Sequence, residues 1–194
     1  MTIAIEPTTA NATQTWAVDP AHTNVEFAVK HMMISTVKGR FADVTGLLKG
    51  DMSDPSNFEL DVVVDTASID TRQAQRDEHL RSPDFFDVAK WPSIRFVGRR
   101  VLDQRADDFK LVGDLTIRDV TRELTLDVTS EGAVRDPWGN NRIGFSASGK
   151  IDRREFGLVW NQVLEAGGIA VGDTIKISVD VEFTAVAAET AEAA

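Results

Sequence analysis

The sequence predicts a single, mostly antiparallel β domain, closed into a barrel or rolled into a strongly curled sheet. Apolar and charged residues alternate with a period of two along most of the chain, which is typical of strands with one buried and one wetted face. Several of these runs reach about ten residues, roughly twice the mean strand length. The 194 residues show no linker, repeat or composition shift that would divide them into two domains. Long, one-sided strands joined by short turns favour a closed barrel.

The alternation predicts individual strands. In the first, Val25, Phe27 and Val29 share one face while charged residues occupy the other. Similar alternation indicates further strands, and together the predicted segments are 24–30, 57–65, a run from 94, 109–117, 124–128, 143–151 and 175–183. The run that starts at residue 94 loses its alternation near Arg99 and Arg100, which predicts a β-bulge.

Local signals predict one turn and one or two short helices. Asp136-Pro137-Trp138-Gly139 has the residue preferences of a type I turn. The segment 72–81 (RQAQRDEHLR) predicts a helix, with Thr71 or Asp70 as its cap and Pro83 as its stop. A second helical turn is predicted after His31.

Composition excludes several classes of function. The formal net charge is −10, from 31 acidic and 21 basic residues. That average field repels nucleic acid and opposes stable docking on an anionic membrane. The chain has no cysteine, so disulfides, thiolate metal sites and cysteine nucleophiles are excluded. No segment approaches the ~20 apolar residues of a membrane helix.

The two ends of the chain differ from its body. Residues 1–14 are aperiodic and carry no Lys or Arg and no apolar run, so we expect a flexible lead rather than a secretory signal, and a cytoplasmic protein. Residues 186–194 are small and acidic and predict a flexible tail. The barrel domain is therefore expected over residues 15–185.

Small residues fall in phase with the large apolar ones at Gly98, Gly113, Ala147 and Gly149. They have two interpretations: bulges and close strand crossings, or space left inside the barrel. A strand of ~10 residues spans ~33 Å, so the second interpretation gives a tunnel for a long, thin apolar ligand.

A series of ordered segments resembles the YceI-like family of polyisoprenoid-binding proteins. The segments are WAVDPAH at 16–22, VKHMM at 29–33, GRF at 39–41, SIDTR at 68–72, RDEHLRSPDFFD at 76–87, GDLTIRDVT at 113–121, DRREFGL at 152–158 and GD at 172–173. The resemblance covers about residues 15–185. It implies an eight-stranded antiparallel, lipocalin-like barrel that holds an amphiphilic isoprenoid lipid in its pore.

Candidate ligand-binding residues lie on the apolar faces or in the segments that carry the resemblance. They are Phe27, His31, Phe41, Arg76, His79, Phe85, Phe86, Phe96, Phe145 and Trp160. In the predicted helix, Arg72, Arg76 and His79 share a face suited to a phosphate or quinone head group. The alternative is that Arg76 and its neighbours pair with nearby aspartates and hold the helix on the barrel. Phe85 and Phe86 together plug one end of the barrel if they lie in a loop, or else pack in its core.

Three functions remain open at this stage. The first is a carrier, store or sensor of a prenyl quinone or prenyl phosphate. The second is an interaction or stress-response protein whose acidic exterior meets a basic partner. The third is an enzyme acting on a prenyl lipid, which requires His22 or His79 to reach the cavity. No cofactor fingerprint or metal-ligand spacing is present, so a non-enzymatic binding protein without cofactor or metal is expected, with a homodimer as a further hypothesis.

Overall fold

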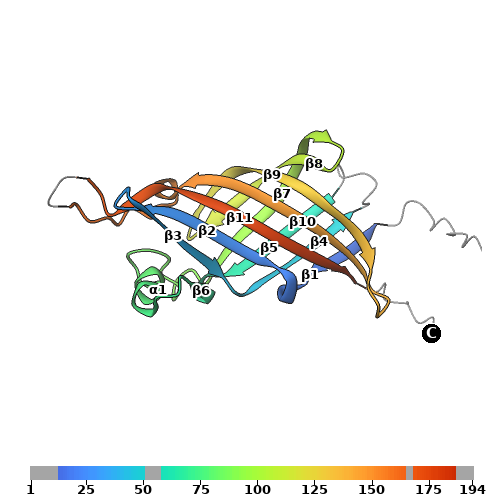
Figure 1. The fold of residues 1–194 in the computed structure, drawn as a ribbon, viewed down its shortest axis with the longest axis horizontal. Coiled ribbons are helices and arrows are strands. Elements are labelled where there is room, and N and C mark those ends of the chain that lie inside the picture. The colour runs from blue at the N-terminus through green and yellow to red at the C-terminus, as the bar shows by residue number, and fades with distance from the viewer. Residues whose placement is uncertain (1–12, 51–57, 165–167, 187–194) are drawn as a thin grey trace, which may run out of the picture.

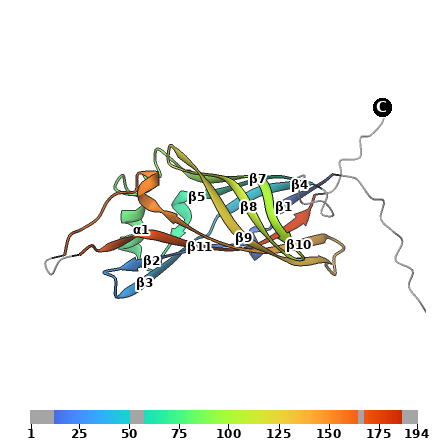
Figure 2. The ribbon, with the colours of Figure 1, turned by 90° about the horizontal axis from the view of Figure 1, so that it is seen from above.

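The computed structural model describes residues 13–50, 58–164 and 168–186, and it shows an elongated β-barrel (Figures 1 and 2). The strands are β1 (Gln14–Val18), β2 (Asn24–His31), β3 (Ser35–Phe41), β4 (Val44–Gly50), β5 (Phe58–Asp65), β6 (Ile69–Asp70), β7 (Ser93–Arg105), β8 (Asp108–Ile117), β9 (Val120–Arg135), β10 (Asn141–Asp152) and β11 (Val171–Ala185). One α-helix, α1 (Ala74–Arg81), and three 3-10 turns, η1 (Pro20–His22), η2 (Thr66–Ser68) and η3 (Arg153–Phe156), complete the described elements.

Eight strands close into a ring, in agreement with the predicted fold. The order is β1-β4-β5-β7-β8-β9-β10-β11, and β11 pairs with β1 to complete the circle. Every pairing between these strands is antiparallel. Inward positions are mainly apolar and outward positions mainly polar or charged, since successive side chains point to opposite faces of a strand. The ring runs from Gln14 to Ala185, while the predicted lead and tail lie almost entirely outside the described residues.

At one end of the barrel, β11 leaves β1 and pairs with β2 instead, and α1 lies at this end. β1 and β2 pair with successive parts of β11, and η1 separates them where Asp19 caps the turn through the Ala21 amide. Beyond this bend, β2, β3 and β6 extend the wall, and β6 pairs only with β3. The helix α1 lies beside β6 at this end (Figure 1). The helix and the loop after it therefore cover the part of the barrel where strand pairing stops.

Two local predictions about helices need correction. α1 begins at Ala74, not at residue 72, and its cap is Gln73 rather than Thr71 or Asp70. Arg72 has a φ of 62°, a left-handed conformation that cannot continue a helix, so Arg72 does not share a helical face with Arg76.

The predicted helical turn after His31 is also absent. Met32 and Met33 have φ values of 49° and 60°, and the Ile34 amide donates to the His31 carbonyl at 3.2 Å. These residues form the tight turn between β2 and β3. Both central residues are left-handed because that hand of turn matches the twist of the paired strands.

The predicted bulge and turn are confirmed. The register between β7 and β8 shifts between Gly98 and Arg100. The Gly139 amide donates to the Asp136 carbonyl at 3.0 Å, which closes the turn between β9 and β10.

Arg142 fastens that turn to the start of the barrel. Its guanidinium donates to Asp136 at 2.8 Å, to Asp19 at 2.6 Å and to Glu182. Hydrogen bonds from His22 and then from Arg142 lower the pKa of Asp19 from 3.8 to about 2. The bond from Arg142 also holds the pKa of Asp136 well below its usual range. The ionised form of both carboxylates is therefore stabilised in the folded protein relative to the unfolded one.

We expect acid to weaken the fold through this network. Because the folded pKa values are depressed, the stabilisation is complete above about pH 4 and is lost as the pH falls toward about 2. Replacing Arg142 with glutamine should lower the free energy of unfolding at neutral pH and flatten its decline between these pH values. Urea denaturation at several pH values measures both effects, with Arg122→Gln as an exposed control. An unchanged pH slope in Arg142→Gln would contradict this account.

Candidate ligand-binding cavity

The described strands surround an apolar cavity of about 530 Å³. This volume lies within the ~300–1,000 Å³ typical of small-molecule sites in proteins. Its wall is built from the inward faces of the strands, together with the loop after α1. Three charged residues among the described ones border it: Asp107, Arg153 and Glu26, which is exposed and alternates with the inward Val25 and Phe27.

Aromatic rings dominate the wall. Nine of the ten phenylalanines line the cavity: Phe27, Phe41, Phe58, Phe85, Phe86, Phe96, Phe109, Phe145 and Phe183. Several contact one another in tilted or edge-on pairs, such as Phe41 with Phe86, whose centroids lie 5.8 Å apart. The phenylalanines carried by strands lie inside because their positions follow the period-two pattern.

The structure divides the ten predicted site residues into two groups. Six line the cavity: Phe27, Phe41, Phe85, Phe86, Phe96 and Phe145. Four do not: His31, Arg76, His79 and Trp160. A direct contact with ligand remains a prediction for all ten.

Sequence reasoning did not select several wall residues. Phe58, Phe109 and Phe183 line the cavity and have the same inward phase as the selected rings, so the alternation pattern contained the signal for them. Arg153 is the other omission. It lies in the DRREFGL segment, but no periodic pattern indicates that an arginine should lie inside a barrel.

The glycines in the wall make room for neighbouring side chains. A Cβ atom on Gly113 would lie 2.4 Å from Cζ of Phe96, and one on Gly149 would lie 2.7 Å from Cδ2 of Leu126. Phe96 and Leu126 therefore lie across these glycines, and the close-approach interpretation holds there. Ala147, by contrast, borders the open cavity.

An aromatic cluster of Phe85, His79 and Trp160 covers the cavity at the α1 end. Phe85 follows α1 in a loop, lines the cavity and is only 6% exposed. Its ring centroid lies 5.1 Å from that of His79 and 5.3 Å from that of Trp160. His79 also contacts Asp84, with Nε2 2.9 Å from Oδ2. His79 and Trp160 thus form the layer behind Phe85 rather than the wall itself.

Arg153 lies at the same end, buried to 2% exposure. Its Nε donates to the Gly172 carbonyl at 3.0 Å, and its Nη1 donates to the Leu158 and Trp160 carbonyls at 2.5 and 2.8 Å. Burial, the largest influence, lowers the pKa of this guanidinium, while Asp173 opposes that shift. The Arg153 side chain thus links η3, the loop after it and β11. We call these linked segments the floor of the cavity.

The other end of the cavity reaches solvent. There the wall includes Gln104, Ala106, Asp107, Gly132 and Ala133, all exposed. Asp103, Asp108 and Glu131 lie next to these positions in the sequence, together with Arg105, and Asp103 and Asp108 line a neighbouring recess that also contains Lys110. The described rim thus carries more acidic than basic groups.

Arg76 holds the helix rather than facing the cavity. Its Nε donates to the Thr71 hydroxyl and its Nη2 to the Thr71 carbonyl, both at 2.7 Å. The buried Asp77 accepts from the same threonine's amide and hydroxyl. Arg81 donates to the Ala67 and Ile69 carbonyls. The clamping alternative thus fits these arginines, with backbone carbonyls as the main acceptors instead of the expected aspartates.

Arg76→Ala is accordingly expected to cost about 1–3 kcal/mol of stability, since it removes two hydrogen bonds to a buried threonine. The affinity for a cavity ligand should change less than about twofold, below 0.5 kcal/mol. Thermal unfolding and a ligand titration measure the two quantities. Arg72→Ala, at an exposed neighbour, is the control. A tenfold loss of affinity with full stability would restore Arg76 as a head-group ligand.

The histidines and the candidate metal ligands lie away from the cavity wall. None of the three histidines lines the cavity. Asp19, His22 and Glu182 form the one candidate metal cluster among the described residues. The guanidinium of Arg142 already donates to both of these carboxylates, and its positive charge opposes a cation there.

The closed ring of eight antiparallel strands with an apolar interior defines a lipocalin-like barrel. Solved structures agree: BcnA from Burkholderia cenocepacia superposes with a TM-score of 0.74 at 21% identity, covering 85% of this chain and 98% of BcnA. A polyisoprenoid binding domain from Saccharophagus degradans superposes with a TM-score of 0.62 at 14% identity, covering 90% of this chain and all of that domain. These two likenesses concern the fold alone.

The chain belongs to the YceI-like domain family, whose model matches residues 16–183. A UPF0312 protein of Staphylococcus aureus (strain USA300) is 36% identical over 167 residues, which cover 86% of this chain and 95% of that protein. Among the described residues, no helix is long and apolar enough to cross a membrane.

Proposed function

We propose that the protein binds an isoprenoid-type lipid inside the barrel, as a carrier, store or sensor, and that it is not an enzyme. The observation that carries the proposal is the cavity itself: about 530 Å³, bounded mainly by phenylalanine and aliphatic side chains and open at one end. The Saccharophagus degradans domain, which has the same fold, is described as polyisoprenoid binding.

The energetics of such a ligand are favourable. Each buried CH₂ group contributes ~0.8 kcal/mol, so one five-carbon prenyl unit contributes about 4 kcal/mol gross. A few units exceed the association cost of ~4–15 kcal/mol. An apolar chain in this cavity needs no polar partner, and few are available there.

The rim favours a head group without negative charge. An amphiphile that inserts its chain first leaves its head at the open end, next to Asp107. The neighbouring acidic residues Asp103, Asp108 and Glu131 oppose a phosphate there. Arg153, the one cation on the described part of the wall, lies at the closed end and already donates to backbone carbonyls.

Native and denaturing mass spectrometry of protein purified without detergent tests the proposal. We expect a stoichiometric prenyl species in the native spectrum that is released on denaturation. Protein that stays empty after incubation with both prenyl quinones and prenyl phosphates would overturn it and favour an interaction protein.

Head-group preference is a separate prediction. A prenyl quinone should bind at least about tenfold more tightly than a prenyl phosphate of equal chain length, a difference of ~1.4 kcal/mol. Asp107→Asn should narrow the difference, while Asp180→Asn, on the outer wall, should not. Equal affinities, or a preference for phosphate, would refute the acidic-rim argument. Competition titrations at low salt measure the ratio, because salt screens exposed charges.

A further inference from the structure

We propose that the β2–β3 end of the barrel docks reversibly on an anionic lipid bilayer. The inference rests on two features of that end that the cavity does not use: a cluster of exposed apolar side chains and, beside it, a row of lysines that form no ion pair with the described residues. It does not depend on what the cavity holds.

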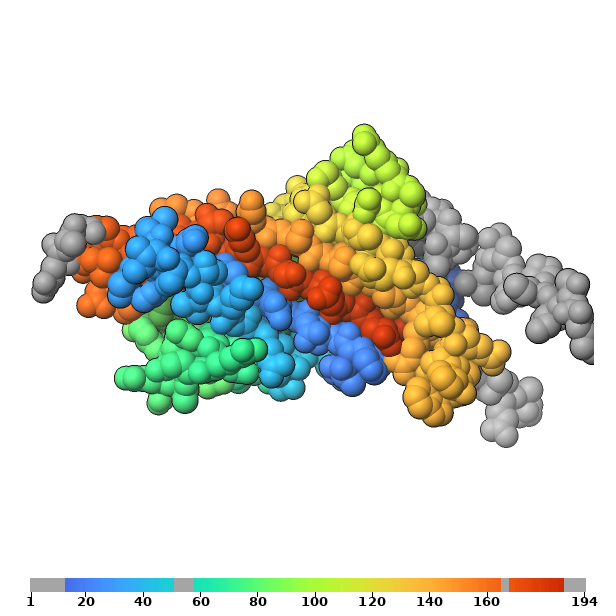
Figure 3. All heavy atoms as spheres, in the orientation of Figure 1, coloured from blue at the N-terminus to red at the C-terminus, as the bar shows by residue number. Residues whose placement is uncertain are grey.

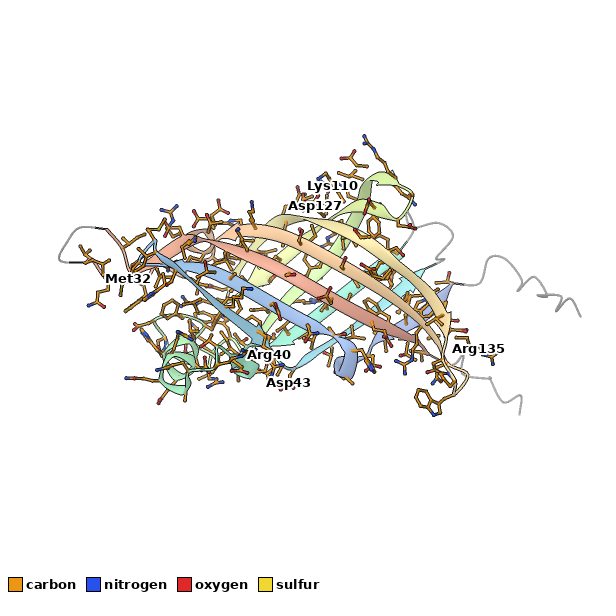
Figure 4. All side chains as sticks on the ribbon, viewed as in Figure 1. Met32, Arg40, Asp43, Lys110, Asp127 and Arg135 are labelled. Carbon is orange, nitrogen blue, oxygen red and sulfur yellow. The ribbon has the colours of Figure 1, made fainter. Side chains whose placement is uncertain are left out.

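The apolar tip consists of Met32, Met33, Ile34, Val159 and Val163. Met33 is 64% exposed and Ile34 85% exposed. The two valines belong to a neighbouring loop that is held against the hairpin: the Met32 amide donates to the Ala170 carbonyl at 2.8 Å, and Val163 forms a bridge with Ile169. Figure 4 labels Met32 at one extremity of the molecule. Single exposed apolar residues are common, but five on adjoining loops at one extremity are not.

The sequence of this turn also points to a contact. Met32 and Met33 adopt left-handed backbone conformations, which Gly or Asn adopts with less strain. Bulky apolar side chains in such positions neither pack in the core nor lower the backbone strain of the turn. A surface that takes up these side chains explains why they project from the turn.

The basic row consists of Lys30, Lys38, Lys150 and Lys176. On the outer wall Lys150 lies directly opposite Lys176, Lys176 opposite Ala28, and Ala28 opposite Lys38, across β10, β11, β2 and β3. Lys30 follows two residues after Ala28 on the same face, next to the apolar tip. All four side chains are exposed, and in the described parts of the chain no carboxylate oxygen lies within 4.0 Å of their ammonium groups.

Nearby acidic groups do not neutralise this row. Asp152 and Asp173 lie 2.5 and 3.2 Å from the guanidinium nitrogens of Arg154. Glu26 lies on the same face two residues before Ala28, and directly opposite Arg40 on β3. Like charges directly opposite each other, such as Lys150 and Lys176, destabilise a sheet. An anionic surface in contact with the row would offset this repulsion between the lysines.

The net charge of −10 does not forbid such docking. The Debye length is about 8 Å at physiological ionic strength, so at contact the local charge outweighs the average over an elongated molecule. Figure 3 shows the face that carries β2, β3 and β11, with the β2–β3 turn at one end of it. Lysines beside projecting apolar side chains match a bilayer, which offers anionic head groups above an apolar interior.

Vesicle co-sedimentation tests the proposal. The probes are phosphatidylcholine vesicles with and without phosphatidylglycerol, free of prenyl lipid, so the result is independent of the proposed cavity ligand. We expect the protein to sediment with the anionic vesicles only, and high salt to release it. Lys30→Gln with Lys176→Gln should lower the partition coefficient roughly twenty-five-fold, about fivefold per lysine. Met33→Ser with Ile34→Ser should lower it to a similar extent.

Matched variants keep the test specific. Lys49→Gln with Lys110→Gln removes the same charge elsewhere on the barrel, and Val134→Ser with Trp138→Ser removes exposed apolar side chains from the β9–β10 end. Both controls should bind as the unchanged protein does. The proposal is overturned if the unchanged protein ignores anionic vesicles, or if the controls lose as much binding as the test variants. Self-association abolished by the lysine substitutions, without vesicle binding, would assign this surface to a second copy of the chain.

Discussion

Replacing Ala147 with phenylalanine is expected to weaken ligand binding strongly while leaving the barrel folded. Ala147 borders the cavity from β10, between Val128 and Val179 on the neighbouring strands. A ring at this position occupies space that an apolar chain would fill. Displacing one five-carbon unit forfeits about 4 kcal/mol, so the affinity should fall on the order of a hundredfold or more.

Ser148→Phe is the matched control, because the next residue on the same strand points outward and is exposed. It adds the same ring without entering the cavity and should bind as the unchanged protein does. Near-ultraviolet circular dichroism and thermal unfolding confirm that both variants are folded. Full affinity in folded Ala147→Phe would show that the ligand does not use this cavity.

The largest loss of stability is expected from Arg153→Ala. This substitution leaves the carbonyls of Gly172, Leu158 and Trp160 without their donor in a buried setting. Each unsatisfied buried group costs ~1–3 kcal/mol, so the free energy of unfolding should fall by about 3–5 kcal/mol. Arg153→Lys should rescue little, because an ammonium group cannot reproduce the planar fork.

The neighbouring Arg154→Ala provides the comparison in urea denaturation. Arg154 is exposed and pairs with Asp152 and Asp173, so its loss should cost less than about 1 kcal/mol. Equal effects at the two positions would mean that Arg153 does not hold the floor of the cavity in the way described.

The strands were predictable where both faces of the sheet are chemically distinct. The alternation around Val25, Phe27 and Val29 places β2, and similar runs place β5 and β7 to β11. β3 and β4 were not predicted, because glycines and small polar residues in STVKGRF and VTGLLKG blur the period-two pattern. The family resemblance, not the periodicity, predicted that eight strands close the ring.

The site was predictable to the extent that it is made of strands. The inward phase indicates Phe96 and Phe145 on the wall, whereas the roles of Arg76 and Arg153 depend on contacts between distant segments. The β2–β3 turn shows a different limit. Tight turns usually carry Gly or Asn, and HMMIS has neither, so its sequence predicted a helical turn. The left-handed backbone angles of Met32 and Met33 could not be predicted from these residue types.

The pairing of β1 with β11 has a consequence for how the barrel forms. Trp16 pairs with Ala185, so the contact that closes the ring joins the first and last strands in the sequence of the barrel. During synthesis, the earlier strands can pair only into an open, curved sheet, because β11 has not yet been made. The interior therefore becomes a separate compartment only at the last step of assembly. Contacts of such long sequence separation form slowly, and until then the phenylalanines of the wall remain exposed to aggregation.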